Sequence, residues 1–440
     1  MGGLRRAQPS GKRLLTPSHP SNPWRLSALV ESRPQILYLA HRVPYPPNRG
    51  DRIRSFHQLR FLAQRAHVSL GFLCEEAPPP DTMHVLRSMC RRVAPHRLGR
   101  HLRRLRGAWS LATGRTATEG LFGCDGLRRT VSQWAQQTRF DAVFVFCSSM
   151  VQYLGAAGLA GVPVVVDLVD VDSQKWLDYG RHSRGPLRWL FQTEAMRLRR
   201  LEASLAARAE ALVVVSRREA ALLQSFCASD RIYAIPNGVD LDHFHPDACD
   251  CPGAAETCVF VGALDYRANL EGVTWFCRAI WPGIRQRHPH AVFRLVGRRP
   301  GHAARRLARL PGVDLVGEVA DVRPYLCEAT VVVVPLRIAP GIQNKVLEAM
   351  AMGKPIVVTP QAREGVEAAP DVHLCQAETP TEWVQTVARL FTDGELRRRL
   401  GCAARQFVEQ HFRWNDQLQL LAGLPGMSKC LRPDNAKVMG

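Results

Sequence analysis

The run "APGIQNKVLEAMAMGKPIVV", from Ala339 to Val358, holds residues whose types and spacing could do chemistry. A helix that begins near Ile342 or Gln343 offers unpaired N–H groups and a positive dipole end, which together suit a phosphate. Lys345, in its first turn, could add a point charge to a diphosphate. Glu348, about one turn deeper, could accept hydrogen bonds from the paired hydroxyls of a ribose.

The same spacing also fits a different structure. Lys345 and Glu348 could form an i, i+3 ion pair on a solvated helix face, worth about 0.2–0.5 kcal/mol. Spacing alone does not separate these interpretations, but the neighbouring residues do. They are mostly apolar (Val346, Leu347, Ala349, Met350 and Met352). A helix of this kind is largely buried, which favours a nucleotide diphosphate site.

Such a site needs elements that hold it, and the chain alternates short apolar strands with amphipathic helices. The expected strands include "QILYLA", "HVSLGFLC", "FDAVFVFC", "VPVVVDLV", "ALVVVS", "TCVFVG", "AVFRLVG", "VDLVGEV", "ATVVVVPL" and "KPIVVT". This order predicts an α/β protein with parallel sheets covered on both faces. Two doubly wound units would face each other across a cleft, with ligands outside the carboxyl ends of the strands.

A Pro-, Asp- and Cys-rich stretch after Pro236-Asn237-Gly238 divides the chain. The predicted parts are a disordered basic extension (1–34), an N-terminal Rossmann-like domain (35–235), a linker (236–255), a C-terminal Rossmann-like domain (256–404), a final helix (405–424) and a tail (425–440).

The order of a strand, a glycine turn and "NKVLEAMAMGKPIVV" resembles the nucleotide-sugar signature of GT-B glycosyltransferases of family four. The chain also resembles the bacterial sugar transferases associated with exopolysaccharide and PEP-CTERM sorting loci. Supporting stretches are "PYPPNRGDRIRSFHQLRFLA", "DLVDVDSQKWLDY", "VVVSRREAALL", "IPNGVDLDHFHP", "FVGALDYRANLEGVTWF" and "DVRPYL". They occur in the right order over about residues 35–420, and jointly they are specific.

The resemblance implies that the N-terminal domain binds the acceptor, that the C-terminal domain binds the nucleotide sugar, and that the final helix (405–424) closes the fold by returning toward the N-terminal domain. It also implies roles for residues at matching positions. Glu348 would bind the ribose hydroxyls, and the backbone of Gly341, Ile342 and Gln343 would approach the diphosphate and the donor sugar. Gly262 matches the glycine after the first strand of the donor domain. The loop with Arg49, Gly50 and Asp51 would face the phosphates from the N-terminal domain.

The chain departs from the family pattern at three positions. The family pairs two glutamates eight residues apart, but Pro340 stands where the first would be, so the identity of the donor sugar stays open. A basic pair often follows the donor-domain glycine, whereas this chain has Ala263 and Asn269. We hypothesise that Arg267 and Lys345 offset the missing charge.

Further candidates lie after strands of the N-terminal half. Asp167, Asp170, Asp172 and Lys175 could meet acceptor hydroxyls or the sugar ring, and His41 could lie over the cleft as a further acceptor-site candidate. The aspartates could equally serve as N-caps and in loop hydrogen bonds. They resemble a DxD metal motif, but GT-B enzymes usually need no metal, so we expect no metal and no cofactor. Ser216 is expected to cap a helix.

The net charge of +20 is unevenly distributed. From Thr82 to Thr118 there is no acidic residue, while Arg residues crowd beside Leu and Trp109. This stretch could lie on anionic lipid, form a solvated face or hold nucleic acid. No RRM or zinc-finger signature supports nucleic acid. The thirteen cysteines occur without CxxC pairs, which predicts free thiols in a reducing cytoplasm.

The sequence therefore predicts a cytoplasmic glycosyltransferase, peripheral at the inner face of the plasma membrane. It would move a sugar, with retention, from a nucleotide diphosphate sugar to a glycan or polyprenyl-linked acceptor in exopolysaccharide biosynthesis. Retention at the anomeric carbon is what the family resemblance implies, and the lack of a side chain that stands out as a nucleophile suits a front-face transfer. The alternative is a GT-B protein that binds nucleotide sugars without turnover, suggested by Pro340 and the missing basic pair.

Overall fold

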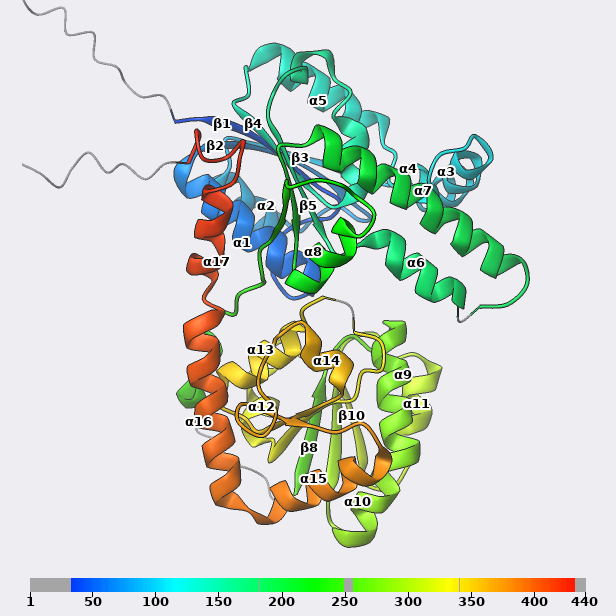
Figure 1. Cartoon of the computed structure of the whole chain (residues 1–440), viewed down its shortest axis with the longest axis vertical. Helices are drawn as coiled ribbons and strands as arrows, with labels where there is room; N and C mark the ends of the chain where they lie inside the picture. The colour runs from blue at the N-terminus through cyan, green and yellow to red at the C-terminus, as the bar shows by residue number, and fades with distance from the viewer. Residues whose placement is uncertain (1–32, 182, 249–255, 340, 432–440) are drawn as a thin grey trace, which may run out of the picture. The chain divides into compact units, whose positions relative to one another are not determined.

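The computed structural model describes residues 33–181, 183–248, 256–339 and 341–431. Most of the predicted extension, part of the linker, Pro340 and the end of the predicted tail lie outside these residues. From Pro34 to the last described residue the chain forms one unit, which contains two sheets (Figure 1).

The first sheet has seven strands, paired in parallel in the order β3-β2-β1-β4-β5-β6-β7. Its strands are β1 (Gln35–Ala40), β2 (His67–Cys74), β3 (Arg92–Arg97), β4 (Ala142–Phe146), β5 (Val164–Val169), β6 (Ala211–Val214) and β7 (Ile232–Ala234). The helices that connect them are α1 (Gly50–Arg65), α2 (Pro80–Met89), α3 (Arg100–Ala112), α4 (Ala117–Leu121), α5 (Asp125–Gln137), η1 (Ser148–Tyr153), η2 (Ala157–Leu159), α6 (Asp172–Arg181), α7 (Pro186–Arg208) and α8 (Arg217–Gln224).

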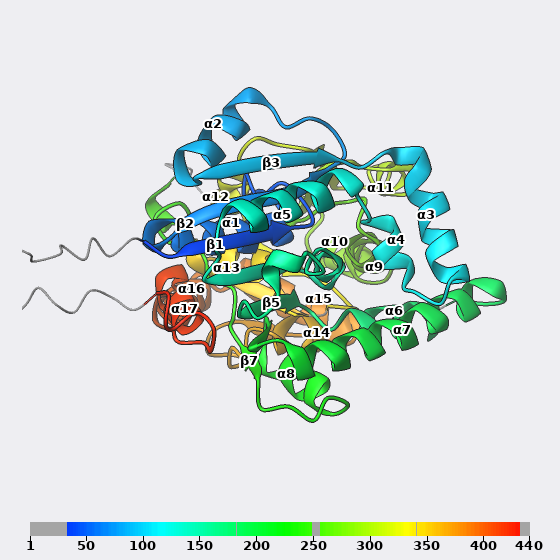
Figure 2. The same ribbon diagram turned by 90° about the horizontal axis from the view of Figure 1, so that it is seen from above.

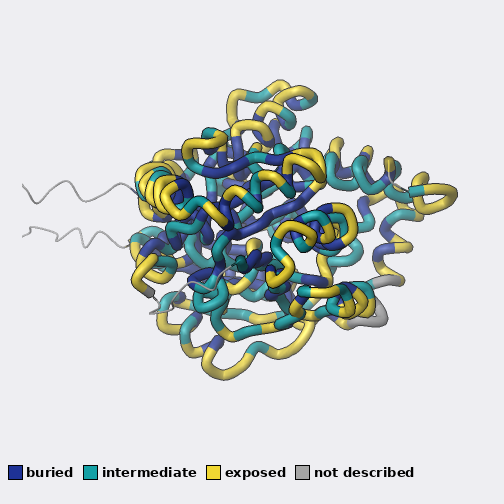
Figure 3. Tube along the Cα trace, turned by 90° about the horizontal axis from the view of Figure 1, so that it is seen from below, coloured by how far each residue is buried: buried dark blue, intermediate teal, exposed yellow. Residues whose placement is uncertain are grey.

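Alternate residues of β1 pack into two different cores, because successive side chains of a strand point to opposite faces. Ile36 and Tyr38 join a cluster with residues of α1, whereas Leu37 and Leu39 join a cluster with residues of α5. Both faces of the sheet are therefore covered, as expected for a parallel sheet. Figure 3 shows buried strands enclosed by helices that carry exposed residues.

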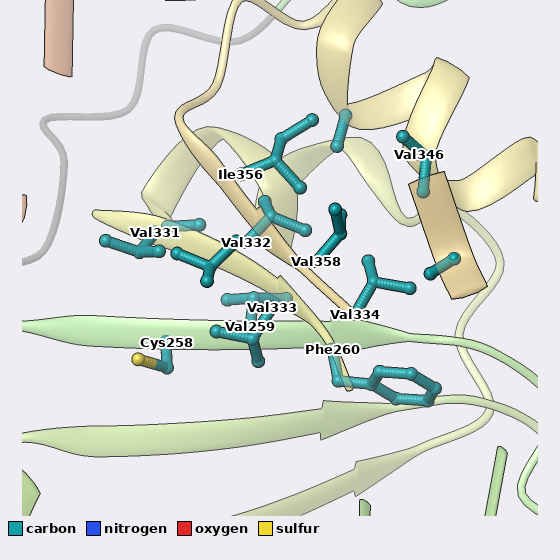
Figure 4. Close-up of a cluster of buried hydrophobic side chains, with 14 of the residues drawn as sticks. Cys258, Val259, Phe260, Val331, Val332, Val333, Val334, Val346, Ile356 and Val358 are labelled. Atoms are coloured by element: carbon teal, nitrogen blue, oxygen red, sulfur yellow. The ribbon is translucent and has the colours of Figure 1, made fainter. Parts of the chain in front are cut away.

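The second sheet has six strands, paired in parallel in the order β10-β9-β8-β11-β12-β13. They are β8 (Thr257–Val261), β9 (Val292–Val296), β10 (Val313–Gly317), β11 (Val331–Val334), β12 (Ile356–Val358) and β13 (Cys375–Gln376). Valines of β8, β11 and β12, with Phe260 and Val346, form part of the core drawn in Figure 4. The helices here are η3 (Pro246–Ala248), α9 (Arg267–Trp275), η4, a π-helix (Phe276–Ile280), α10 (Trp281–Arg287), α11 (His302–Leu307), α12 (Arg323–Glu328), α13 (Asn344–Ala351), α14 (Pro360–Glu364) and α15 (Pro380–Thr392).

Each sheet reverses its strand order at one place, between β1 and β4 in the first and between β8 and β11 in the second. In doubly wound sheets, ligands bind outside the carboxyl ends of the strands at such a switch point. The loops that leave these strands begin at His41 after β1, Gly262 after β8 and Pro335 after β11. These loops carry most of the predicted site.

The last helices run back to the first sheet. A single helix was predicted over 405–424, but the structure has α16 (Gly394–His411) and α17 (Trp414–Ala422), with a break between them. At the break the carbonyl of Phe412 accepts a hydrogen bond of 2.8 Å from the N–H of Val239, which a continuous helix would prevent. Gly238 leaves room for Trp414, and α17 packs against α1 (Figure 1).

Strand β3 was not predicted. Its sequence, "RVAPHR", lacks an apolar alternation, and it lies at an edge of the sheet. Edge strands tolerate proline and charge, because one side of their backbone needs no partner strand. Other expectations are confirmed: the Ser216 side chain accepts a hydrogen bond from the N–H of Glu219 at the start of α8, and all the described cysteines are free.

Candidate functional site

The centre of the candidate site is the start of α13. Gly341 has a φ of +65°, a conformation that favours glycine, and α13 begins at Asn344, slightly later than predicted. Val346, Leu347, Ala349 and Met350 are buried, so this is not a solvated helix. Its N-cap residue, Gln343, makes no side-chain cap hydrogen bond.

Lys345 is directed to helix α9 of the same lobe. Its Nζ donates a hydrogen bond of 2.9 Å to Oδ1 of Asn269, and Nδ2 of Asn269 donates one of 2.9 Å to the carbonyl of Ala263. Lys345 and Glu348 form no ion pair within 4.0 Å in the described part of the chain. Asn269, which stands where the family pattern has a basic residue, thus binds the ammonium of Lys345. The ammonium group of Lys345 therefore lies next to Asn269, one of the two positions where the family pattern has a basic residue.

Burial shifts the pKa values of both groups toward neutrality. It raises the pKa of Glu348 to about 7, with Lys345 partly opposing the shift. It lowers the pKa of Lys345 to about 8, with Glu348 partly opposing that shift. Both side chains are charged together mainly between these two values.

Affinity for a nucleotide diphosphate sugar is therefore expected to be highest near pH 7–8. Below this range Glu348 gains a proton and accepts fewer hydrogen bonds; above it Lys345 loses the charge that attracts the diphosphate. Binding titrations from pH 6 to 9 with UDP-glucose test this, since its diphosphate stays fully ionised over that range and its charge does not change. Glu348→Gln should flatten the acidic limb and Lys345→Met the alkaline limb. Unchanged limbs in both variants would contradict these assignments.

A second helix N-terminus lies close to the first. Helix α1 begins at Gly50, and its N-cap residue Arg49 makes no side-chain cap hydrogen bond. A Cβ on Gly50 would lie 3.8 Å from Nδ2 of Asn344, the first residue of α13. That Nδ2 is buried and has no hydrogen-bond partner among the described residues. Two positive helix ends and an unpaired donor thus meet at one place.

Asp51 and His41 lie beside this place and contact each other. Nε2 of His41 lies 3.7 Å from Oδ2 of Asp51, whose carboxylate also pairs with Arg42 at 3.0 Å and with Arg49 at 3.3 Å. Burial alone would raise the pKa of Asp51, but His41, Arg42 and Arg49 hold it well below its usual range. Burial lowers the pKa of His41. The carboxylate of Asp51 thus holds the side chains of Arg42 and Arg49 in place through ion pairs.

The structure adds basic residues that were not predicted. Arg42 and Arg52 join Arg49, and Arg298 approaches from the loop after β9. Burial, together with the charges of Arg42 and Arg298, lowers the pKa of Arg49 to about 10, while Asp51 opposes the shift. The Arg298 carbonyl accepts a hydrogen bond of 3.1 Å from the N–H of Leu264, beside Gly262. The only sequence signal for Arg298 was "VGRRP" after a buried strand.

A buried polar network joins the two lobes behind this place. Nε of Arg54 donates a hydrogen bond of 2.7 Å to Oδ2 of Asp167, and its Nη1 donates one of 2.9 Å to Oδ1 of Asn237. Nδ2 of Asn237 then donates one of 2.8 Å to Oδ1 of Asn344. Arg54 and Asp167 are fully buried. Sequence reasoning missed this network, because its members are far apart in the chain.

The other predicted residues occupy the rim of the same region. Asp172 begins α6 and accepts a hydrogen bond of 2.6 Å from Oγ of Ser148. Lys175 lines a small pocket with Tyr266 and Arg267, and the Arg267 guanidinium lies 5.9 Å from the ring centroid of Tyr179.

Two loop positions depend on close packing. A Cβ on Gly262 would lie 3.0 Å from Nδ2 of Asn269. Ile342 is buried and anchors the loop before α13. Within the described residues there is no group of three or more His, Cys, Asp or Glu side chains that could hold a metal ion.

Comparisons with known proteins identify the family and the fold. Residues 60–243 match the family model "Glycosyltransferase Family 4", and residues 255–393 match the model "Glycosyl transferases group 1". No curated protein matches the sequence significantly.

Several solved structures share the fold. Sucrose-phosphate synthase from Thermosynechococcus elongatus has a TM-score of 0.64 at 18% identity, over 89% of this chain and 98% of that one. Anabaena HepE in complex with UDP has a TM-score of 0.63 at 16% identity, over 88% and 98%. A glycosyltransferase from Rickettsia africae has a TM-score of 0.62 at 12% identity, over 91% and 99%.

The two family models cover most of the chain, one on each sheet, and the sheets match the two Rossmann-like domains of the GT-B architecture. The chain thus belongs to the group 1, family-four glycosyltransferases of the GT-B fold.

Proposed function

We infer that the protein transfers a sugar, with retention of the anomeric configuration, from a nucleotide diphosphate sugar to a glycan or lipid-linked acceptor in exopolysaccharide biosynthesis. The observation that carries this inference is the meeting of the N-termini of α13 and α1, with Lys345 and Glu348 on α13. HepE, which shares the fold, has been solved with UDP and with UDP-glucose. The resemblance to exopolysaccharide sugar transferases supports the pathway.

In this proposal the diphosphate lies on the amides before Lys345, and Glu348 accepts hydrogen bonds from the ribose hydroxyls. Charge on the leaving diphosphate is stabilised by the two helix dipoles, Lys345, Arg49 and Arg298. These groups supply the charge in place of a metal. The leaving phosphate takes the proton of the acceptor hydroxyl, so catalysis depends on positioning and electrostatics. Movement about the 236–255 linker would close the site and exclude water.

The test is a thermal-shift screen against UDP-, GDP-, ADP- and TDP-sugars, followed by transfer from the labelled sugar that binds. We expect one nucleotide class to stabilise the protein and a labelled glycan or lipid to form, in the presence of EDTA as well. Binding with neither transfer nor hydrolysis would instead favour a non-catalytic nucleotide-sugar-binding protein.

We also propose that the N-terminal lobe docks on an anionic membrane surface through α3. Helix α3 packs its small residues inward: Gly107 faces Leu121, and Oγ of Ser110 donates a hydrogen bond of 2.7 Å to the carbonyl of Thr116. At 3.6 residues per turn, Leu105 and Trp109 lie on the side away from this contact. They are 68% and 73% exposed. Exposed apolar side chains amid arginines suit a lipid interface.

Helix α7 extends this exposed apolar surface. Trp189 and Met196 are seven residues apart, hence on one side of the helix, and both are exposed. Nη1 of Arg197 donates hydrogen bonds of 2.7 Å to the carbonyls of Leu111 and Arg115, which ties α7 to the end of α3. Figure 2 shows α3 and the α6–α7 pair at the same end of the lobe. No helix among the described residues is long and apolar enough to cross a membrane.

Cosedimentation with vesicles tests this docking. The protein should bind phosphatidylcholine vesicles that contain phosphatidylglycerol at low salt, and pure phosphatidylcholine vesicles much less. Leu105→Ser with Trp109→Ser should weaken the binding about tenfold, through lost apolar burial. Leu420→Ser, at an exposed leucine of α17, is the matched control. If the wild-type protein ignores the anionic vesicles at low salt, the membrane proposal fails.

A further inference from the structure

The backbone is strained where β5 ends. Val169 has a φ of +68°, and the N–H of Asp170 donates a hydrogen bond of 3.0 Å back to the carbonyl of Leu168. A three-residue turn around a β-branched residue with positive φ is rare, and such strain costs about 1–3 kcal/mol. Oδ1 of Asp167 accepts a hydrogen bond of 2.9 Å from the N–H of Val169, which helps to hold the turn. Strain of this kind persists where the surrounding structure requires it.

This turn brings the side chain of Asp170 to the loop before α13. A Cβ added to Gly341 would overlap Oδ1 of Asp170 and would lie 2.9 Å from Cγ1 of Val215. Gly341 also has a positive φ. Position 341 therefore requires glycine for two reasons: its backbone has a positive φ, and a side chain there would collide with the carboxyl group of Asp170.

The three aspartates at the end of β5 differ in their partners. The carboxylate of Asp167 is bound by Arg54 and Gln58, and that of Asp172 by Ser148. Asp170 makes no side-chain hydrogen bond and no ion pair with any residue that the structure describes. A half-buried carboxyl group without a partner is costly, and a structural role as a cap or loop bond does not account for it.

The surroundings of Asp170 are polar and mixed in charge. Burial and the charges of Glu219 and Asp172 together raise its pKa to about 7, while Lys175 and Arg54 oppose the shift. Lys175 sits near Asp172, Tyr266 and Tyr179, which outweigh its own burial and raise its pKa. The carboxyl group thus has acceptor capacity at neutral pH, beside the loop that precedes the diphosphate position.

We propose that Asp170, from the N-terminal lobe, accepts a hydrogen bond from a hydroxyl of the donor sugar and helps to select that sugar. This rests on the proposed function, because it assumes a diphosphate on the start of α13 with its sugar toward Gly341. In this arrangement both lobes bind the donor: the lobe with the second sheet binds the nucleotide, and the lobe with the first sheet contacts the sugar through Asp170. The sequence agrees with this proposal, because the family pattern has a glutamate at position 340 and this chain has proline there. A carboxyl group from the other lobe would then contact the sugar instead.

The test compares UDP with UDP-glucose on wild type and Asp170→Asn. We expect UDP affinity to stay within about twofold, while affinity for UDP-glucose and kcat/KM for transfer from it fall about ten- to hundredfold. Asp230→Asn, at an exposed position of the same lobe, is the control. The melting temperature of Asp170→Asn should be unchanged or higher at pH 8, because the ionised carboxylate is disfavoured by burial, whereas loss of a structural contact would lower it.

Three outcomes would overturn the assignment: equal weakening of UDP and UDP-glucose, no change in either, or a change only in KM for the acceptor. Failure of the proposed function is a separate result, because it would appear in the wild type as a lack of transfer from any nucleotide sugar. A donor analogue that lacks the contacted hydroxyl should bind wild type and Asp170→Asn equally.

Discussion

Replacing Glu348 with glutamine is expected to reduce kcat/KM for transfer by about a hundredfold or more. A carboxylate can accept a hydrogen bond from each of two ribose hydroxyls, whereas an amide offers one acceptor oxygen and turns an NH2 group toward the other hydroxyl. Hydrogen bonds to a charged group contribute about 1.5–3 kcal/mol each, and about 2.7 kcal/mol corresponds to a factor of a hundred. Steady-state kinetics with the nucleotide sugar found in the binding screen measure the effect.

Two observations separate a binding role for Glu348 from a structural one. Burial raises the pKa of Glu348 to about 7, so its ionised form destabilises the fold above that pH. Glu348→Gln should therefore leave the melting temperature at pH 8 unchanged or raise it slightly while activity falls. Glu318→Gln, at an exposed glutamate after β10, should change neither quantity. Activity of Glu348→Gln near that of wild type would remove this residue from the site.

Arg54→Met is expected to destabilise the fold strongly, by about 3–5 kcal/mol, because removing one partner of a buried ion pair leaves the other charge uncompensated. Among the described residues, the Asp167 carboxylate would then accept hydrogen bonds only from Gln58 and from the N–H of Val169. The side-chain oxygen of Asn237 would lose the hydrogen bond that Arg54 donates. Denaturant unfolding followed by circular dichroism measures the loss. Arg60→Met, at an exposed position of the same helix, should cost far less.

A double-mutant cycle separates the ion pair from simple packing. If the loss comes from the stranded carboxylate, adding Asp167→Leu to Arg54→Met should recover much of the stability, because the buried charge is gone. No recovery would mean that packing, not charge, dominates. Since Asn237 connects Arg54 to Asn344 at the start of α13, Arg54→Met should also weaken donor binding under conditions where it remains folded.

Most of the local elements could be predicted from the sequence because their signals are local. Valine-rich runs predicted buried parallel strands, and the apolar residues around Lys345 and Glu348 predicted a mostly buried helix after a glycine turn; both predictions are confirmed. Strand β3 and the break between α16 and α17 were missed. In each case a tertiary contact, either an edge pairing with β2 or the bond from Val239 to Phe412, outweighs weak local preference.

The candidate site could be predicted only in part. The sequence pointed to Lys345 and Glu348 because they lie within one helix. It could not place Arg298 near Arg49, or Asn237 beside Asn344, because strand order and the approach of the two lobes bring those residues together. The sequence also could not show that Leu105 and Trp109 are exposed, since their exposure depends on which face of α3 packs against α4.

By itself, then, the sequence determined the class of fold, the helix that carries the candidate nucleotide site and the glycine turn before that helix. These features could be predicted because the spacing of apolar residues and the residues that begin or end a helix are local properties of the chain. Only the tertiary structure decided which of the three aspartates at the end of β5 is left without a partner among the described residues and which loop it approaches. The physical reason is distance along the chain: Asp170 and Gly341 meet only after both sheets have formed and their carboxyl ends have come together.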